Sequence, residues 1–135
     1  MKRNAIVLDK NLSAGEVGNA SAILMGQVSK IDPQIFSDAS ITDLDNVQHA
    51  GIKYSTVILK GGSGQITNLS KQLANNDDIN SFVFTALGQS LNNKFEKYAD
   101  SISKSSLADT RPVGVIISGD DEEIRQLTKK FSLLK

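Results

Sequence analysis

Short apolar runs rich in β-branched residues alternate with longer amphipathic segments along this chain. The segments between the runs repeat apolar residues every three or four positions, which is the period of a helix. Such alternation predicts an α/β fold in which helices cover a sheet. Four of the runs are predicted strands: Asn4 to Asp9, Tyr54 to Lys60, Asn80 to Thr85 and Val113 to Ser118.

Capping patterns predict where two of the helices begin. Ser13 and Glu16 have the S-x-x-E spacing, in which each side chain can accept a hydrogen bond from the other residue's amide. Asp120 and Glu123 predict the start of the last helix in the same way, and proline at position 33 predicts the end of the first helix. The last helix is expected to turn Ile124, Leu127 and Phe131 inward and to carry Lys129 and Lys130 in its last turn.

Two more helices are predicted from apolar spacing alone. One runs from about Gln65 to Ala74 with Ile66, Leu69 and Leu73 inward. The other is expected to be continuous, because its apolar residues recur at steps of four, four, three and four. These residues are Leu87, Leu91, Phe95, Tyr98 and Ile102.

A polar stretch from Ser40 to Ile52 lacks helical periodicity. It predicts an irregular hairpin or loop that turns near Asp45 and Asn46. The single histidine of the chain, His49, lies in this stretch. Because loops often carry functional residues, His49 is a candidate site residue, although a lone loop histidine is more often structural.

The first helix contains an unusual stripe of small residues. Ala14, Gly18, Ala22 and Gly26 lie at steps of four and therefore share one face. Each helical glycine costs about 1 kcal/mol relative to alanine, so a compensating contact is expected. The favoured explanation is close packing against the sheet or against a second copy of the chain. The alternative is that Gly15 and Gly18 leave room for an anion at the helix start.

A second glycine cluster, Gly61 to Gly64, follows the second predicted strand. A phosphate-binding P-loop has its lysine after the glycines, whereas Lys60 precedes them here. The cluster is therefore expected to be a flexible connection between a strand and a helix. An anion-binding nest of backbone amides is the alternative.

Composition excludes several kinds of chemistry. The chain has no cysteine and one histidine, which removes disulfides, thiolate nucleophiles and multi-histidine metal sites. Neither a metal nor a cofactor is expected. Lysine plus arginine and aspartate plus glutamate each total 15, so the chain lacks the basic excess typical of nucleic-acid binding.

No apolar run reaches the length of a membrane span, and the first residues do not resemble a signal peptide. We expect a single cytoplasmic domain spanning residues 1–135.

Several segments occur in an order that is similar to a known family. They are LDKNLSAGEVGNASAILMG, TDLDNVQHAGI, TVILK, FVFTALGQS and VGVIISG. The positions that match are Asp9, Asn19, Asp45, His49, Gly51, Ile52, Thr85 and Gln89. In these the chain resembles a family of small uncharacterised bacterial proteins that shares the fold of type II peptidyl-tRNA hydrolase. The resemblance implies a three-layer α/β/α sandwich around a mixed sheet of about four strands.

The hydrolase activity is not implied by this resemblance. Hydrolases of that type begin the first helix with a motif close to G-K-G-K-x-A-A-Q, and its lysine and glutamine lie in the active cleft. Aligned from Gly15, this chain reads GEVGNASA, with Glu16 and Gly18 at the lysine positions. The loss of these cations removes electrostatic help for a phosphate-bearing substrate, so peptidyl-tRNA hydrolysis is not expected.

Three classes of function remain. The favoured one is a module that binds a small molecule or peptide at the carboxyl ends of the strands, where open α/β sheets bind ligands. Its candidate residues are Asp9, Asn19, His49, Thr85 and Gln89. The second class is a hydrolase of another substrate, with His49 as general base oriented by Asp9 or Asp45. The third is a structural or partner-binding protein, such as a homodimer joined through the small-residue face.

Overall fold

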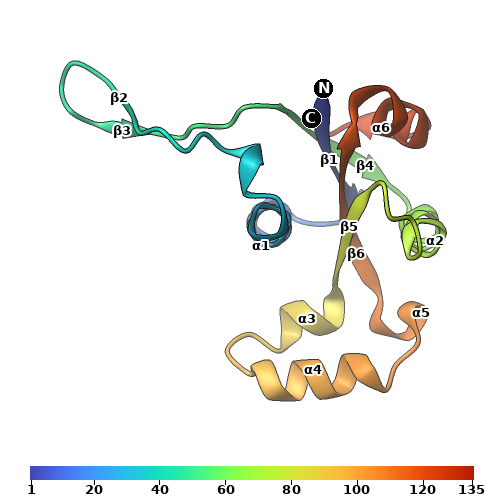
Figure 1. Cartoon of the computed structure of the whole chain (residues 1–135). Coiled ribbons are helices and arrows are strands. Elements are labelled where there is room, and N and C mark those ends of the chain that lie inside the picture. The colour runs from blue at the N-terminus through green and yellow to red at the C-terminus, as the bar shows by residue number, and fades with distance from the viewer.

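A mixed sheet of five strands forms the centre of the protein, in the order β5-β6-β1-β4-β7 (Figure 1). The computed structural model describes residues 1–135. β1 pairs with β4 in parallel and with β6 antiparallel, while β5 pairs with β6 and β7 with β4 antiparallel. β1, β4 and β5 therefore end at the same edge of the sheet. The strands are β1 (Lys2–Asp9), β4 (Ser55–Gly61), β5 (Asn80–Thr85), β6 (Pro112–Asp120) and β7 (Ser132–Leu133).

The mixed α/β fold and the four predicted strands are confirmed, with ends that differ by at most two residues. The sheet has a fifth strand, β7, that the sequence did not predict. β7 consists of two residues, which pair with Leu59 and Lys60 of β4. A strand this short shows no apolar alternation, so its sequence carries no strand pattern.

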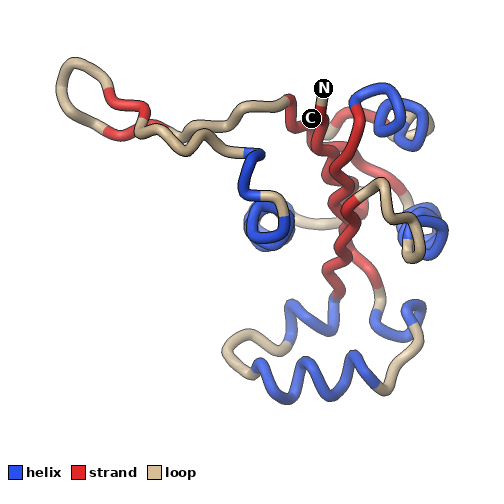
Figure 2. Tube along the Cα trace, viewed as in Figure 1, coloured by secondary structure: helices blue, strands red, loops and turns tan.

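Helices pack on both faces of the sheet (Figure 2). α1 (Ala14–Ile31) covers one face and α2 (Ser63–Leu73) and α6 (Asp121–Thr128) cover the other. Successive β1 residues point to opposite faces, so Ile6 and Leu8 join the α1 side of the core while Ala5 and Val7 join the other side. The predicted inward residues of α2, namely Ile66, Leu69 and Leu73, are all buried.

The two predicted capping boxes have different outcomes. Around α1 both hydrogen bonds form: the Ser13 amide donates to Glu16 Oε1 at 2.9 Å, and the Glu16 amide donates to Ser13 Oγ at 3.3 Å. The hydrogen bond from the Ser13 amide, followed by that with the Ser13 side chain, lowers the pKa of the Glu16 carboxyl group. At α6, Asp120 occupies the N-cap position, but its side chain makes no capping hydrogen bond. α6 also ends at Thr128, so the two lysines expected in its last turn follow the helix instead.

The expectation of one long helix after β5 is wrong. The segment forms α3 (Ala86–Ser90) and α4 (Phe95–Ser103), followed by the short α5 (Leu107–Thr110). Asn93, between α3 and α4, has a φ of 64°, a left-handed conformation that asparagine adopts more readily than most residues. No residue of α4 is buried, and Phe95 is 74% exposed. The regular apolar spacing therefore continued across a turn and did not mark one continuous helix.

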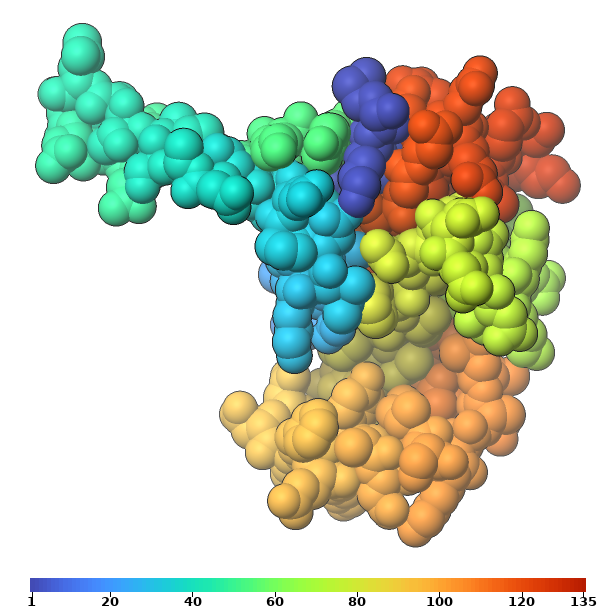
Figure 3. All heavy atoms as spheres, in the orientation of Figure 1, coloured from blue at the N-terminus to red at the C-terminus, as the bar shows by residue number.

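The stretch after α1 forms a hairpin that projects from the body of the molecule (Figures 1 and 3). It follows the short helix η1 (Pro33–Ile35) and contains β2 (Ile41–Thr42) and β3 (Gln48–His49). The turn lies where it was predicted, with Asn46 at a φ of 66°. The base is fastened by hydrogen bonds, including the Ser37 amide to the Gly51 carbonyl at 2.7 Å. Residues 40–50 are all exposed.

The small-residue stripe does not pack against the sheet. The buried residues of α1 are Ala20, Leu24 and Val28, which lie two positions after the members of the stripe and hence on the opposite side of the helix. A Cβ atom added at Gly18 or Gly26 would meet no atom within 4 Å. Packing on the sheet is therefore wrong as an explanation, and contact with a second copy stays a prediction.

A buried polar contact crosses the three middle strands. Asn4 of β1 is fully buried and accepts a hydrogen bond from the Ser118 hydroxyl of β6 at 2.7 Å. The Asn4 amide group also donates to the Thr56 hydroxyl of β4 at 3.2 Å. Because a buried polar group without a partner is costly, these bonds favour one register of the three strands.

Candidate functional site

A cavity of about 550 Å³ lies where the carboxyl ends of β1 and β5 and the start of α2 meet the beginning of β6. Open α/β sheets commonly bind ligands at this edge, because the connections that follow the strands diverge there. Most of its wall is polar or small, and only three lining residues are hydrophobic. The cavity is lined by Asp9, Ser63, Gly64, Thr67, Asn68, Ala86, Ala108, Arg111, Pro112 and Val113.

Asp9 is the last residue of β1 and is half-buried at the wall of the cavity. Its Oδ1 atom accepts a hydrogen bond from the Asn11 amide at 2.9 Å, which holds the carboxylate against the turn that follows the strand. Asp9 forms none of the ion pairs of the structure. One carboxylate oxygen is thus free to accept a hydrogen bond from a ligand.

Arg111 lies at the entrance to β6 and has a strained backbone. Its φ of 58° and ψ of 76° belong to the left-handed region, which costs energy for a side chain of this kind. The Arg111 carbonyl accepts a hydrogen bond from the Ala86 amide at 2.8 Å, which ties this residue to the end of β5. Its exposed side chain forms no ion pair within the chain. The cavity therefore has one anionic and one cationic residue, both without a charged partner.

The pairing of β5 with β6 is irregular beside the cavity. The register shifts between Phe84 and Thr85, so that Thr85 pairs with Pro112. Such irregularities redirect the chain and are frequent next to functional sites. Thr85 itself is 3% exposed, and its hydroxyl accepts a hydrogen bond from the Gly88 amide at 3.0 Å. This bond gives Thr85 a structural role as the N-cap of α3.

The start of α2 forms the opposite side of the cavity. Gly62 is the N-cap and provides no side-chain cap for the first amides of the helix. Ser63, Gly64 and Thr67 line the cavity, and the Thr67 hydroxyl donates to the Ser63 carbonyl at 2.9 Å. Free amides and the positive end of the helix dipole at this position favour an anionic group of a ligand.

The structure does not gather all the predicted site residues in one place. Asp9 lines the cavity, whereas Asn19 lies exposed on α1 and Gln89 half-exposed on α3. His49 and Asp45 lie on the projecting hairpin (Figure 1). The predicted convergence assumed that the hairpin folds over the strand ends. Its polar sequence specifies a turn but does not specify the direction in which the hairpin leaves the body.

The carboxylate beside His49 is Asp43, and neither Asp9 nor Asp45 provides it. The His49 Nε2 atom lies 2.7 Å from Asp43 Oδ2, with 55% and 39% of the two side chains exposed. The other oxygen of Asp43 accepts hydrogen bonds from the Asp45 and Val47 amides at 2.9 and 3.1 Å. The bond with His49, followed by that with Val47, lowers the pKa of Asp43. The predicted orientation of His49 by Asp9 or Asp45 is therefore wrong.

Replacement of His49 by alanine is expected to raise the pKa of Asp43 towards its usual value of 3.8, because the largest cause of the lowering is removed. Since the pKa is lowered in the folded protein, this interaction stabilises the hairpin above pH 3.8 and is lost as the pH falls through the lowered pKa. NMR titration of the Asp43 carboxyl carbon measures the change. Ser13→Ala is the control, because it should move the pKa of Glu16 and leave Asp43 unchanged. An identical Asp43 titration in His49→Ala would contradict the assignment.

Sequence reasoning missed four polar residues of the cavity: Ser63, Thr67, Asn68 and Arg111. Ser63 lies inside the glycine cluster, whose position between a strand and a helix was a usable signal. Arg111 precedes Pro112 at the start of a strand, but its left-handed backbone has no signature in the sequence.

No three histidine, cysteine, aspartate or glutamate side chains lie close enough together to hold a metal ion. None of the helices combines the length and apolar composition that a bilayer span requires.

Comparison with known proteins identifies the family but not an activity. No curated protein matches the sequence. The solved structure of Atu0240 from Agrobacterium tumefaciens strain C58, described as a protein of unknown function, is similar in fold. The two structures have a TM-score of 0.87 at 15% sequence identity, and the match covers 99% of this chain and 98% of that one. The family model described as "Protein of unknown function (DUF2000)" matches residues 2–135, and the chain therefore belongs to the DUF2000 family.

Proposed function

We propose that the protein is a cytoplasmic module that binds a small polar molecule in the cavity at the carboxyl ends of β1 and β5. The observation that carries this proposal is the pair of unpartnered charges, Asp9 and Arg111, on the wall of one cavity of about 550 Å³. The half-buried Asp9 carboxylate has no charged partner, and a ligand group of opposite charge would offset the cost of its partial burial. The exposed Arg111 guanidinium is free to pair with an anionic group of the same ligand.

The chemistry of the wall specifies the kind of ligand. An anionic group of the ligand would lie near Arg111 and the start of α2, where a guanidinium and free helical amides favour negative charge. A donor or cationic group would face Asp9. Thr67 and Asn68 would add neutral hydrogen bonds between these two ends. A small molecule that carries both an acidic group and an amino group, or the end of a peptide, has this arrangement.

The fold is also proposed to be related to that of type II peptidyl-tRNA hydrolases. The support is the sequence resemblance, and the absence of the lysines of their first-helix motif argues against a shared activity. Binding without peptidyl-tRNA hydrolysis is therefore the function that the residues favour.

A thermal-shift screen with a library of amino acids, small peptides and organic acids tests the binding function. A ligand present at a hundredfold excess over its Kd stabilises the folded state by about 2.7 kcal/mol. For a chain of this size, that should raise the melting temperature by on the order of 10 °C. Asp9→Asn and Arg111→Asn are expected to abolish most of the shift. Asparagine is chosen at position 111 because it tolerates the left-handed backbone.

Two matched substitutions serve as controls for the screen. Asp45→Asn removes one carboxylate from the projecting hairpin, and Arg125→Ala removes one guanidinium from α6. Both are expected to leave the ligand-induced shift unchanged. The proposal fails if no compound in the library stabilises the protein, or if the controls reduce the shift as much as the cavity variants do.

A further inference from the structure

Three lysines from three separate segments surround a second hollow, on the other side of the start of α2. The hollow has a volume of about 410 Å³ and contains no hydrophobic residue in its lining. Lys10 follows β1, Lys60 lies near the end of β4, and Lys130 lies between α6 and β7. It is lined by Lys10, Asn11, Lys60, Gly61, Gly62, Gln65, Lys130 and Ser132, none of which lines the cavity that contains Asp9 and Arg111.

Backbone pairing fixes the relative positions of these lysines. The Lys10 amide donates to the Gly61 carbonyl at 3.0 Å, which places Lys10 beside the end of β4. Lys60 pairs with Ser132 in the antiparallel contact of β4 and β7, and Lys130 lies two residues before that contact. The sheet therefore fixes the backbone positions of Lys10 and Lys60, and Lys130 lies in the connection that leads from α6 into the same contact.

The electrostatics of the hollow favour an anion. None of its lining residues is acidic, and none of the three lysines takes part in an ion pair of the structure. The chain as a whole is neutral, with 15 basic and 15 acidic residues, so the three lysines form a local excess of positive charge. Like charges repel one another, and an anion between them would remove that repulsion. Gly62, the N-cap of α2, adds the positive end of a helix dipole to the same wall.

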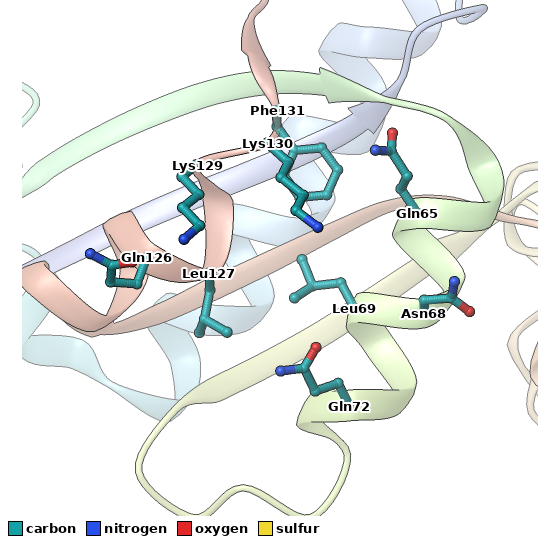
Figure 4. Close-up of a pocket in the computed structure, with 9 residues that line it drawn as sticks. All are labelled: Gln65, Asn68, Leu69, Gln72, Gln126, Leu127, Lys129, Lys130 and Phe131. Carbon is teal, nitrogen blue, oxygen red and sulfur yellow. The ribbon is translucent and has the colours of Figure 1, made fainter.

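A polar groove of about 330 Å³ continues from the hollow between α2 and α6 (Figure 4). Gln65 and Lys130 line both spaces, and Lys130 extends toward α2. Leu69, Leu127 and Phe131 provide a small apolar surface within the groove. Side-chain amides can both donate and accept hydrogen bonds, as the hydroxyl groups of a sugar require. The amide residues of the groove are Gln65, Asn68, Gln72 and Gln126.

We propose that this region binds a phosphate-bearing small molecule, with the phosphate among Lys10, Lys60 and Lys130 and a hydroxyl-rich body along the groove between α2 and α6. Lysine is a common ligand of phosphate, acting as a point charge with three donors. The site differs from a P-loop, since its lysines come from three segments. Gly61 serves packing, because a Cβ at this position would lie 2.6 Å from the Phe131 ring.

Isothermal titration calorimetry with ribose 5-phosphate, ribose and inorganic phosphate tests the proposal. Ribose 5-phosphate is expected to bind more tightly than inorganic phosphate, and ribose is expected not to bind. Lys10→Ala, Lys60→Ala and Lys130→Ala should each weaken the binding of ribose 5-phosphate by about tenfold, the scale of one lost charge-assisted hydrogen bond. Lys97→Ala on α4 removes the same charge outside the hollow and is the matched control, with unchanged affinity expected.

Several results would overturn the proposal. One is no heat of binding for ribose 5-phosphate or inorganic phosphate at millimolar concentrations, with circular dichroism confirming a folded protein. Another is an equal loss of affinity in Lys97→Ala and in the three variants of the hollow, which would indicate a nonspecific response to net charge. Binding of single-stranded RNA without binding of the small phosphates would also reject it. The hollow shares no lining residue with the cavity that contains Asp9 and Arg111, so failure of this test leaves the function proposed above intact.

Discussion

Replacement of Ile116 by alanine is expected to lower the free energy of unfolding by about 2–5 kcal/mol, the range for removal of a large aliphatic side chain from a packed core. Ile116 is fully buried in the middle of β6. It pairs with Ile6 of β1 on one side and with Phe82 of β5 on the other. Because two strands and the face of α1 surround this site, collapse into the vacated space is restricted. Urea denaturation followed by circular dichroism measures the loss.

Ile23→Ala provides a control with the same chemistry. Ile23 is 40% exposed on α1, so its truncation removes less buried area and is expected to cost below about 1 kcal/mol. Equal losses in the two variants would contradict the placement of Ile116 at the centre of the core.

Replacement of Gly114 by alanine is expected to destabilise the fold by about 1–3 kcal/mol, the usual cost of overpacking. A Cβ atom at Gly114 would lie 2.7 Å from Leu8 Cδ2 and 3.2 Å from Leu24 Cδ1. Both leucines are almost completely buried, so their side chains have little freedom to move away. The added methyl group would force apart β6, β1 and α1. Thermal and urea denaturation should report the same direction of change.

The same substitution at Gly18 is expected to have the opposite sign. A Cβ there would meet no atom within 4 Å, and alanine is favoured over glycine inside a helix by up to about 1 kcal/mol. Gly18→Ala should therefore stabilise the protein. If it destabilised the protein instead, and did so more strongly at higher protein concentration, the small-residue stripe would be a contact with a second copy of the chain.

The sequence predicted those helices and strands whose apolar spacing or capping residues match their burial and their ends in the folded protein. The strand from Val113 to Ser118 is apolar because both of its faces are covered, and that coverage is visible in the sequence as an uninterrupted run. Ser13 and Glu16 predicted the start of α1 because a capping box involves only neighbouring residues. The strand at Ser132 was missed because it depends on pairing with the distant β4. The break at Asn93 is a local turn, and the regular apolar spacing on both sides of it concealed it.

The candidate site was predicted only where a side chain follows directly from a strand. Asp9 was identified because it ends an apolar run, and strands of this kind end at the binding edge of the sheet. Arg111 lies between α5 and β6, and its own left-handed backbone brings it to the same cavity. Its carbonyl accepts a hydrogen bond from the Ala86 amide, a tertiary contact that no local pattern in the sequence indicates. The position of His49 depends on how the hairpin leaves the body, and no local pattern specifies that direction.

The placement of β1 at the centre of the sheet imposes an order on biosynthesis. β1 pairs with residues 55–61 and 114–120, and both partners follow it in the sequence. The buried hydrogen bond between Asn4 and Ser118 can form only when Ser118, 114 residues later in the chain, is present. The apolar β1 segment therefore remains unpaired on one side until β6 has been synthesised, and unpaired segments of this kind are prone to aggregate. A chain that lacks β6 cannot complete its core, because both β1 and β5 pair with this strand.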